Sequence, residues 1–280
     1  MIAEFQYRVR WRSERAHPGS HAGTQLGGGD QFFGYAPFVG HPDPRRIDGR
    51  TSATDPFGQL MVRMFRQRSS IPIYLLADVS ASMGFGHPAS KLATIKAFAD
   101  AAAYSAHRSG DPFGLYACDD EVRWDLHLPL RQYRGLPSEL AAALDAFDPV
   151  ARSSVGLRAA AGLLGRARSL VFVMSDFHFE SAEVAALFDA LAHHDVVPLV
   201  VWQGAELSRL PRWGWATLLD PESGRERTLF MRPSLHAAFA ERLRQRRSEL
   251  MRLTAPLGRR PFFVDQSIDA DALTEYFLDG

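Results

Sequence analysis

Short runs of almost purely apolar residues alternate with longer segments of helical periodicity over most of this 280-residue chain. The clearest runs lie at residues 71–77, 170–174 and 196–201. Runs of this length without polar alternation are typical of parallel strands that are covered on both faces of a sheet. Their alternation with helical segments predicts an α/β fold. We therefore expect a doubly wound sheet with helices on both faces.

A hairpin predicts one antiparallel strand at the edge of this sheet. Residues 113–118 and 122–128 flank a polar turn, and the second segment alternates apolar with polar residues, as a half-exposed edge strand does. A second hairpin, at residues 215–219 and 225–231, and a long arginine-rich helix form an expected insertion at about 212–256. Further helices are expected near residues 92–102, 138–147, 155–166, 183–192 and 269–277, and a last short strand at 261–264.

Residues 1–70 differ from the rest of the chain, and we expect them to form a strand and loop extension that packs on the main domain at 71–280. Apolar residues alternate with polar ones through residues 5–12, which predicts a strand with one buried face. Residues 16–40 are rich in Gly, His and Pro and are expected to form a loop. A possible strand follows at 60–65.

The composition excludes several classes of protein. Lys and Arg together number 32, as do Asp and Glu, so the formal net charge is zero and does not favour nucleic-acid binding. No apolar run is long enough to span a bilayer, and the start of the chain lacks the order of a signal peptide. We therefore expect a cytoplasmic protein without membrane insertion. The single cysteine, Cys118, excludes an internal disulfide and is expected to be a buried core residue.

An acidic and hydroxyl-rich motif directly follows the first apolar run. Asp78, Ser80 and Ser82 occupy alternate positions there, and Asp176 ends the second run in the same way. In an open α/β sheet, ligands bind outside the carboxyl ends of the strands, where the strand order reverses. If the two strands are neighbours at that point, the carboxylates of Asp78 and Asp176 meet in one crevice.

These side chains form a set of hard oxygen ligands. Two carboxylates and two hydroxyls, with a third hydroxyl from Ser153 or Ser154 in a neighbouring loop, match the preference of Mg²⁺ for oxygen ligands and retained water. The set carries too little negative charge to enclose a cation, so we expect an open coordination position. The structural alternative is that Asp and Ser after a strand cap the next helix. Nearby, His178 and Glu180 could shape the rim of the site or belong to an ordinary surface loop.

The motif and its surroundings resemble a known family. Asp78-x-Ser80-x-Ser82, with Asp176 at another strand end, is similar to the metal-ion-dependent adhesion site (MIDAS) of von Willebrand factor A domains. Further motifs are similar to the DUF58 group, whose A-domain proteins are often encoded beside MoxR-type AAA+ ATPases. They are DPRRID at 43–48, FGQLMVR at 57–63, SMGFG at 82–86 and SDF at 175–177. Within that group, PRRID at 44–48 and DFHF at 176–179 most resemble the S-protein branch of bacterial methanol-oxidation clusters.

This resemblance implies a von Willebrand factor A fold, a bound Mg²⁺ ion and a partner protein whose Asp or Glu completes the metal shell. The implied ligands are Ser80 and Ser82 directly, Asp78 and Asp176 directly or through water, and Ser154 or Ser153 where the family usually has threonine. The implied function is that of a non-enzymatic adaptor. It would work with a MoxR-type AAA+ ATPase on a client protein, in the maturation of a metalloenzyme such as methanol dehydrogenase.

Two other classes of function stay open. A Mg²⁺-dependent hydrolase or phosphatase would use Asp78, although the motif lacks the Asp-x-Asp spacing of phosphoryl transfer and the chain lacks a glycine-rich phosphate loop. An assembly platform would use the arginines of the long helix, which are most simply a solvated face. Loss of partner binding in chelator would favour the adaptor, whereas a strong salt dependence would favour the platform.

Overall fold

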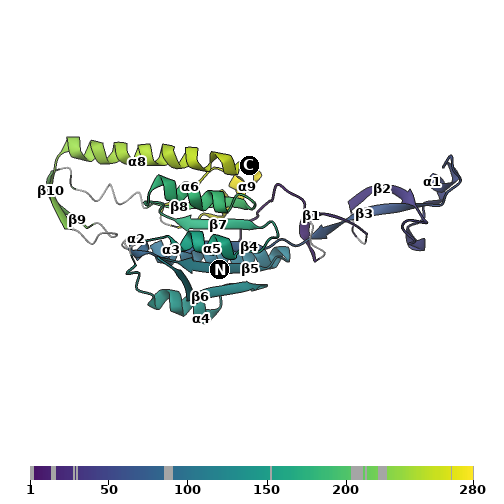
Figure 1. Cartoon of the computed structure of the whole chain (residues 1–280), viewed down its shortest axis with the longest axis horizontal. Coiled ribbons are helices and arrows are strands. Elements are labelled where there is room, and N and C mark those ends of the chain that lie inside the picture. The colour runs from purple at the N-terminus through teal and green to yellow at the C-terminus, as the bar shows by residue number, and fades with distance from the viewer. Residues whose placement is uncertain are drawn as a thin grey trace. The chain divides into compact units, whose positions relative to one another are not determined.

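The chain folds into two compact units, which we call the sheet unit and the N-terminal unit. The computed structural model describes residues 3–13, 17–27, 29, 31–84, 91–151, 153–202, 211, 213–219, 226–265 and 267–279. The sheet unit consists of Met1–Arg8, Pro72–Arg108 and Pro112–Gly280, and the N-terminal unit consists of Val9–Ile71 and Ser109–Asp111. Figure 1 labels most of the elements of both units.

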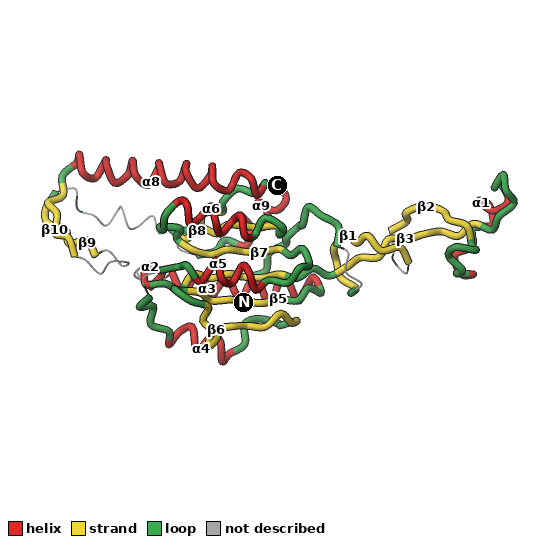
Figure 2. The backbone as a smooth tube through the Cα atoms, in the orientation of Figure 1, coloured by secondary structure: helices red, strands yellow, loops and turns green. Residues whose placement is uncertain are grey.

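The sheet unit is built on a six-stranded sheet with the order β11-β8-β7-β4-β5-β6 (Figures 1 and 2). Every neighbouring pair is parallel except β5 with β6, which confirms the mostly parallel sheet with one antiparallel edge strand. Because β5 and β7 lie on opposite sides of β4, the strand order reverses between β4 and β7. The strands are β4 (Ile73–Asp78), β5 (Phe113–Cys118), β6 (Val122–Arg131), β7 (Leu170–Ser175), β8 (Asp195–Val201) and β11 (Phe262–Val264).

Helices cover both faces of this sheet. On one face, Tyr74 and Leu76 of β4 share a core cluster with residues of α5, α6 and α8. On the other face, Phe172 of β7 packs against Phe98 of α3 and Phe277 of α9, with ring centroids 5.0 and 6.1 Å away. The apolar side chains therefore point to both faces, as the uninterrupted apolar runs predict. The helices are α3 (Lys91–Ser109), α5 (Gly156–Leu163), α6 (Ser181–Ala190), α8 (Pro233–Thr254) and α9 (Ala270–Leu278).

Two further predictions for the sheet unit are confirmed. The second hairpin is confirmed as β9 (Gly214–Leu219) paired antiparallel with β10 (Glu226–Met231), while its turn lies outside the described residues. The carboxylate of Asp269 caps α9 by accepting from two backbone N–H groups of its first turn. Among the described helices, none has the length and apolar character needed to cross a membrane. The described part of this unit also contains α2 (Ala81–Gly84), α4 (Ser138–Ala146) and η2 (Ala255–Leu257).

The prediction of a strand at residues 5–12 is wrong. These residues belong to no strand, although Phe5 is 3% exposed and packs against the rings of Phe98 and Phe172. The backbone N–H of Phe5 donates to the hydroxyl of Ser105 at 3.0 Å rather than to a neighbouring strand. The alternation of apolar and polar residues reflects an extended segment with one buried side. It does not show that another strand lies beside the segment to pair with it.

The N-terminal unit contains a three-stranded antiparallel sheet in the order β1-β3-β2. The loop expected at 16–40 is therefore wrong over most of its length, whereas the possible strand at 60–65 is confirmed within β3. Close backbone approach explains one of the glycines that made the region look like a loop, because a Cβ at Gly23 would lie 2.4 Å from the carbonyl oxygen of Gln67. The elements are β1 (Pro18–Gly27), β2 (Gln31–Pro37), η1 (Pro44–Arg46), α1 (Gly49–Ala53) and β3 (Met61–Ser69).

Candidate functional site

Asp78 and Asp176 lie side by side at the carboxyl edge of the sheet, where its strand order reverses. Asp78 is the last residue of β4, and Asp176 directly follows β7, its parallel neighbour. Both residues are 1% exposed. Two carboxylates buried this deeply need compensating partners, and the surrounding residues supply them.

Ser80, in the bend after β4, and Ser82, in the first turn of α2, face the same site. The hydroxyls of the two serines are 3.3 Å apart, and both residues are buried. The backbone N–H of Ser80 donates to Oδ1 of Asp78 at 2.9 Å, so one carboxylate oxygen shapes the local turn. Ser80 precedes α2, so this bond does not cap that helix. The hydroxyl of Ser82 also lies near Asp176 and contributes to lowering the pKa of that carboxyl.

Ser175 joins the ends of β4 and β7. Its hydroxyl donates to Oδ2 of Asp78 at 2.6 Å and accepts the backbone N–H of Phe177 at 2.9 Å. Both oxygens of Asp78 therefore accept at least one hydrogen bond, although each keeps a further lone pair. Sequence reasoning placed Ser175 in a family motif but gave it no role at the site.

Lys91 is a charged residue of the site that sequence reasoning missed. It is the first residue of α3, and its Nζ atom lies 3.0 Å from Oδ2 of Asp176, with 4% of the side chain exposed. The other oxygen of Asp176 accepts the backbone N–H of His178 at 3.3 Å. The available signal was rarity, since Lys91 and Lys96 are the only lysines in the chain. Two carboxylates and one ammonium leave the site with one formal negative charge.

The two carboxylates differ in acidity because their neighbours differ. Burial and the negative charge of Asp176 raise the pKa of Asp78 to about 6, against hydrogen bonds from Ser175 and Ser80. Burial acts on Asp176 in the same direction and is the largest single effect, but the electrostatic contributions of Lys91 and His178 and the hydrogen bonds of Lys91 and Ser82 together outweigh it and lower the pKa of Asp176 below its ordinary value. Asp176 is therefore ionised at neutral pH, and Asp78 becomes ionised as the pH rises above about 6.

The loop before α5 reaches the motif through its backbone. The N–H of Ala81 donates to the carbonyl oxygen of Ala151 at 2.7 Å. The hydroxyl of Ser153 accepts the N–H of Val155 at 3.2 Å, whereas Ser154 lines a hollow of about 400 Å³ beside α6. In the part of the chain that the structure describes, neither hydroxyl is hydrogen-bonded to Asp78 or Asp176, so the role of Ser154 as a ligand stays a prediction.

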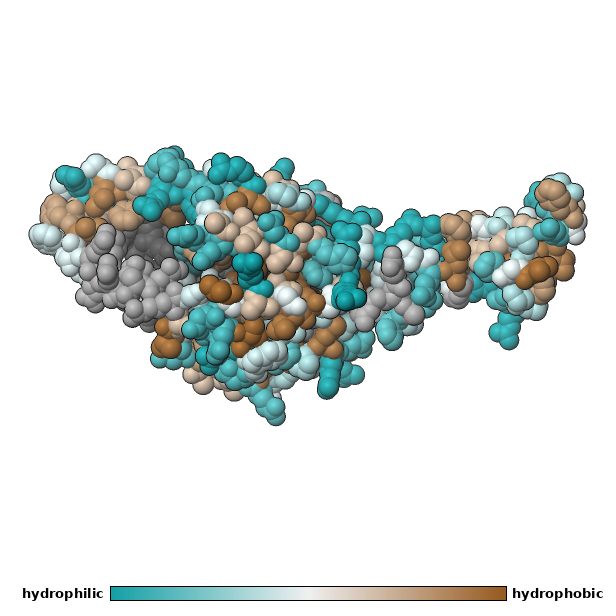
Figure 3. Space-filling view, viewed as in Figure 1, coloured by the Kyte–Doolittle hydropathy of each residue, from teal (hydrophilic) through white to brown (hydrophobic). Residues whose placement is uncertain are grey.

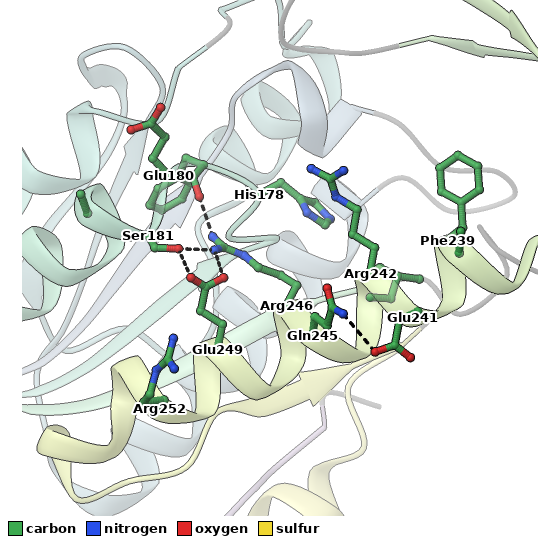
Figure 4. A pocket seen from close by; sticks show the side chains of 14 residues that line it. His178, Glu180, Ser181, Phe239, Glu241, Arg242, Gln245, Arg246, Glu249 and Arg252 are labelled. Carbon is green, nitrogen blue, oxygen red and sulfur yellow. Dashed lines mark hydrogen bonds and ion pairs between the residues drawn. The ribbon is translucent and has the colours of Figure 1, made fainter. Parts of the chain in front are cut away.

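The segment after Asp176 is held from both sides. The indole N–H of Trp202 donates to the carbonyl oxygen of Asp176 at 2.8 Å, and the ring of His178 stacks on the ring of Trp202 at 5.8 Å. From α8, Arg246 donates to the carbonyl oxygens of Phe177 and Phe179. Figure 4 shows Arg246 reaching from α8 toward Ser181 and Glu249, to which its Nη1 also donates, at 2.7 and 2.8 Å.

A hollow of about 1170 Å³ lies between α8 and this segment, and both His178 and Glu180 line it (Figure 4). The two residues therefore border a groove, but Asp78, Ser80, Ser82 and Asp176 do not line it, so a role of His178 and Glu180 at the rim of the site stays a prediction. Hydrophilic side chains gather along α8 in the space-filling view (Figure 3). Arg242, Arg244 and Arg247 are exposed there, in agreement with a solvated face, while Arg246 is partly buried by its contacts.

The donor set suits a hard divalent cation better than a soft one. It consists of carboxylate and hydroxyl oxygens, whereas Cys118 is buried and burial raises the pKa of its thiol. Within the described ranges, no group of three or more His, Cys, Asp and Glu side chains could hold a metal. A cation here would thus depend on Ser80 and Ser82 as well as on the two carboxylates.

A family model and a curated relative agree with the DUF58-like motifs of the sequence. The family model described as "Protein of unknown function DUF58" matches residues 38–249. The "Uncharacterized protein in moxR 3'region" of Paracoccus denitrificans is 38% identical over 101 residues, which cover 36% of this chain and 96% of that protein. Among solved structures, the conserved hypothetical protein BatB from Bacteroides thetaiotaomicron is 13% identical with a TM-score of 0.46, and the match covers 74% of this chain and 97% of that one.

Proposed function

This chain belongs to the DUF58 family, and we propose that it is a non-enzymatic adaptor that binds a partner protein through a divalent cation at the Asp78–Asp176 edge. The observation that carries the proposal is the convergence of two buried carboxylates with two buried hydroxyls at the point where the strand order reverses. Ligands bind at such points in open α/β sheets. The proposal includes a von Willebrand factor A type of fold, which the single antiparallel edge strand β6 supports.

The cation is proposed to be Mg²⁺. Ser80 and Ser82 would ligate it directly, Asp78 and Asp176 directly or through water, and Ser154 would contribute from the neighbouring loop. When bound, the ion would supply a positive centre with an open coordination position. Because the hydroxyls are neutral and Lys91 offsets one carboxylate, the protein's own charge does not saturate a divalent ion. An aspartate or glutamate of the partner would complete both the shell and the charge balance.

The partner is proposed to be a MoxR-type AAA+ ATPase that acts with this chain on a client protein in the cytoplasm. The printed name of the Paracoccus relative, which refers to the moxR 3' region, supports the ATPase. A client such as methanol dehydrogenase, matured as a metalloenzyme, rests on the motifs at 44–48 and 176–179 alone.

A catalytic role for Asp78 is the competing proposal, because a carboxyl group with a pKa near 6 suits proton transfer. The geometry does not favour this role. Asp78 is 1% exposed, and its two oxygens accept from the N–H of Ser80 and the hydroxyl of Ser175. We therefore propose binding without catalysis.

The test is co-purification of the chain with the MoxR-type ATPase from the same organism, in Mg²⁺ and in excess chelator. We expect capture in Mg²⁺, loss of capture in chelator, and loss in Asp78→Asn, which preserves the shape of the side chain. Asp145→Asn is the matched control, since Asp145 is exposed and its side chain pairs with Lys96 at the surface. Capture that is equal in Mg²⁺ and in chelator would overturn the metal-dependent mechanism.

A further inference from the structure

The ammonium of Lys91 neutralises Asp176, one of the two carboxylates that a divalent cation at this site would use. Its Nζ atom is 3.0 Å from Oδ2 of Asp176, and both side chains are almost fully buried. Asp176 also interacts with the hydroxyl of Ser82, which in turn lies 3.3 Å from the hydroxyl of Ser80. Lys91 is thus not a surface neighbour of the site but one of the charged groups inside it.

A divalent ion and this ammonium compete for the same carboxylate. An ion that used Asp176 as a ligand, directly or through one water, would lie within a few ångströms of a buried positive charge. Like charges at such a distance repel strongly where water is excluded. Asp176 has only one negative charge to share, and its other oxygen is already engaged by the N–H of His178. Lysine, with its flexible four-carbon stem, can change direction without a change of backbone.

We infer that Lys91 is the resident cation of the metal-free site and that it withdraws from Asp176 when a divalent cation enters. This inference rests on the metal site of the proposed function and adds a regulation to it. The protein without partner holds its own counter-ion, so metal binding is weakened by the need to displace the ammonium. A partner carboxylate offsets that cost by adding a negative charge to the metal, which couples tight metal binding to partner binding.

Chemical labelling of the wild-type chain tests the exchange without any variant. Lys91 and Lys96 are the only lysines, so an amine-acylating reagent followed by peptide mass spectrometry measures one buried lysine against one more exposed internal reference. We expect Lys91 to be protected without metal and its labelling relative to Lys96 to rise severalfold as MgCl₂ saturates the site. The same labelling is done with Mn²⁺, whose binding electron paramagnetic resonance measures directly. If Lys91 stays protected at Mn²⁺ concentrations that saturate the site, the exchange is overturned.

Substitution provides the second measurement. Lys91→Met and Lys91→Gln remove the competing charge, and we expect their affinity for Mn²⁺ to increase by about tenfold to a hundredfold. Lys96→Met is the matched control and should bind Mn²⁺ as the wild type does. Circular dichroism verifies the fold of each variant, because removal of Lys91 leaves the carboxylate of Asp176 buried without its partner.

The outcomes separate this inference from the proposed function. If Mn²⁺ binds the wild type but the Lys91 variants bind no more tightly, the inference fails and the metal-dependent adaptor stands. If neither the wild type nor folded Lys91 variants bind Mn²⁺, the metal site itself fails, and the exchange fails with it.

Discussion

Arg246 of α8 donates two hydrogen bonds to the carbonyl oxygen of Phe177, from Nε at 3.2 Å and from Nη2 at 2.7 Å. Phe177 directly follows Asp176 and has a φ of 51°, which residues other than glycine rarely adopt. Such a conformation persists only where the surroundings hold it. Here Arg246 holds the carbonyl and Ser175 holds the N–H, so α8 helps to position Asp176.

Replacing Arg246 should loosen this segment. Arg246→Ala removes donors to the carbonyl oxygens of Phe177 and Phe179, and we expect it to lower the free energy of unfolding by about 2–4 kcal/mol. Urea denaturation measures the loss. Arg244→Ala is the control, because Arg244 is an exposed arginine on the same helix that pairs with Glu241 at the surface. Equal stability of the two variants would show that the contacts of Arg246 do not hold the segment.

Replacing Ser175 should affect both the stability of the protein and the pKa of Asp78. Ser175→Ala removes the hydroxyl that donates to Asp78 and accepts from Phe177, so two buried groups lose a partner. We expect a loss of about 1–3 kcal/mol in the free energy of unfolding and a further rise in the pKa of Asp78. Ser248→Ala, at an exposed position of α8, should change neither quantity. An unchanged pKa of Asp78 by carboxyl NMR would contradict this role.

The raised pKa of Asp78 predicts a pH dependence of stability in chelator. The folded state holds the proton of Asp78 more tightly than the unfolded state, so the free energy of unfolding should fall as the pH rises from about 4 to about 6. A pKa raised from 3.8 to about 6 corresponds to at most about 3 kcal/mol. Asp176 acts in the opposite sense and outside this window, because its stabilisation is lost only as the pH falls through its lowered pKa.

Asp78→Asn cannot ionise and should lack this fall. Urea denaturation of both proteins between pH 4 and pH 7 measures the difference. Parallel pH profiles for the wild type and Asp78→Asn would mean that Asp78 does not titrate in this window.

We expect Gly→Ala substitution to have opposite effects at two positions of α5. A Cβ at Gly156 would lie 2.4 Å from the carbonyl oxygen of Glu121, so Gly156→Ala should destabilise the protein and shift the loop that carries Ser153 and Ser154. Nothing lies within 4 Å of a Cβ at Gly162, and Gly162→Ala should stabilise the helix by up to about 1 kcal/mol. Thermal unfolding compares the two. A melting temperature that rises in both variants would rule out the close approach at Gly156.

The strands of the main sheet follow from the sequence because their signal is local. The runs at 71–77, 170–174 and 196–201 are apolar at every position, which only strands buried on both faces require. Sequence patterns were less informative for segments whose structure depends on pairing with another segment. The alternation at residues 5–12 predicted a strand, yet Phe5 packs among rings of the sheet unit, and the glycine-rich segment 16–40 pairs with β3 instead of forming a loop.

The sequence by itself determined that Asp78 and Asp176 lie at the ends of buried strands, with Ser80 directly beyond, because an apolar run and the polar residues after it are neighbours in the chain. Only the tertiary structure decided which charges surround them. Lys91 meets Asp176 across 85 residues, and Ser175 meets Asp78 across 97. No local pattern encodes such pairs, since they exist only after α3 and β7 have packed against β4. The charge balance that decides how a cation binds is therefore a property of the folded protein.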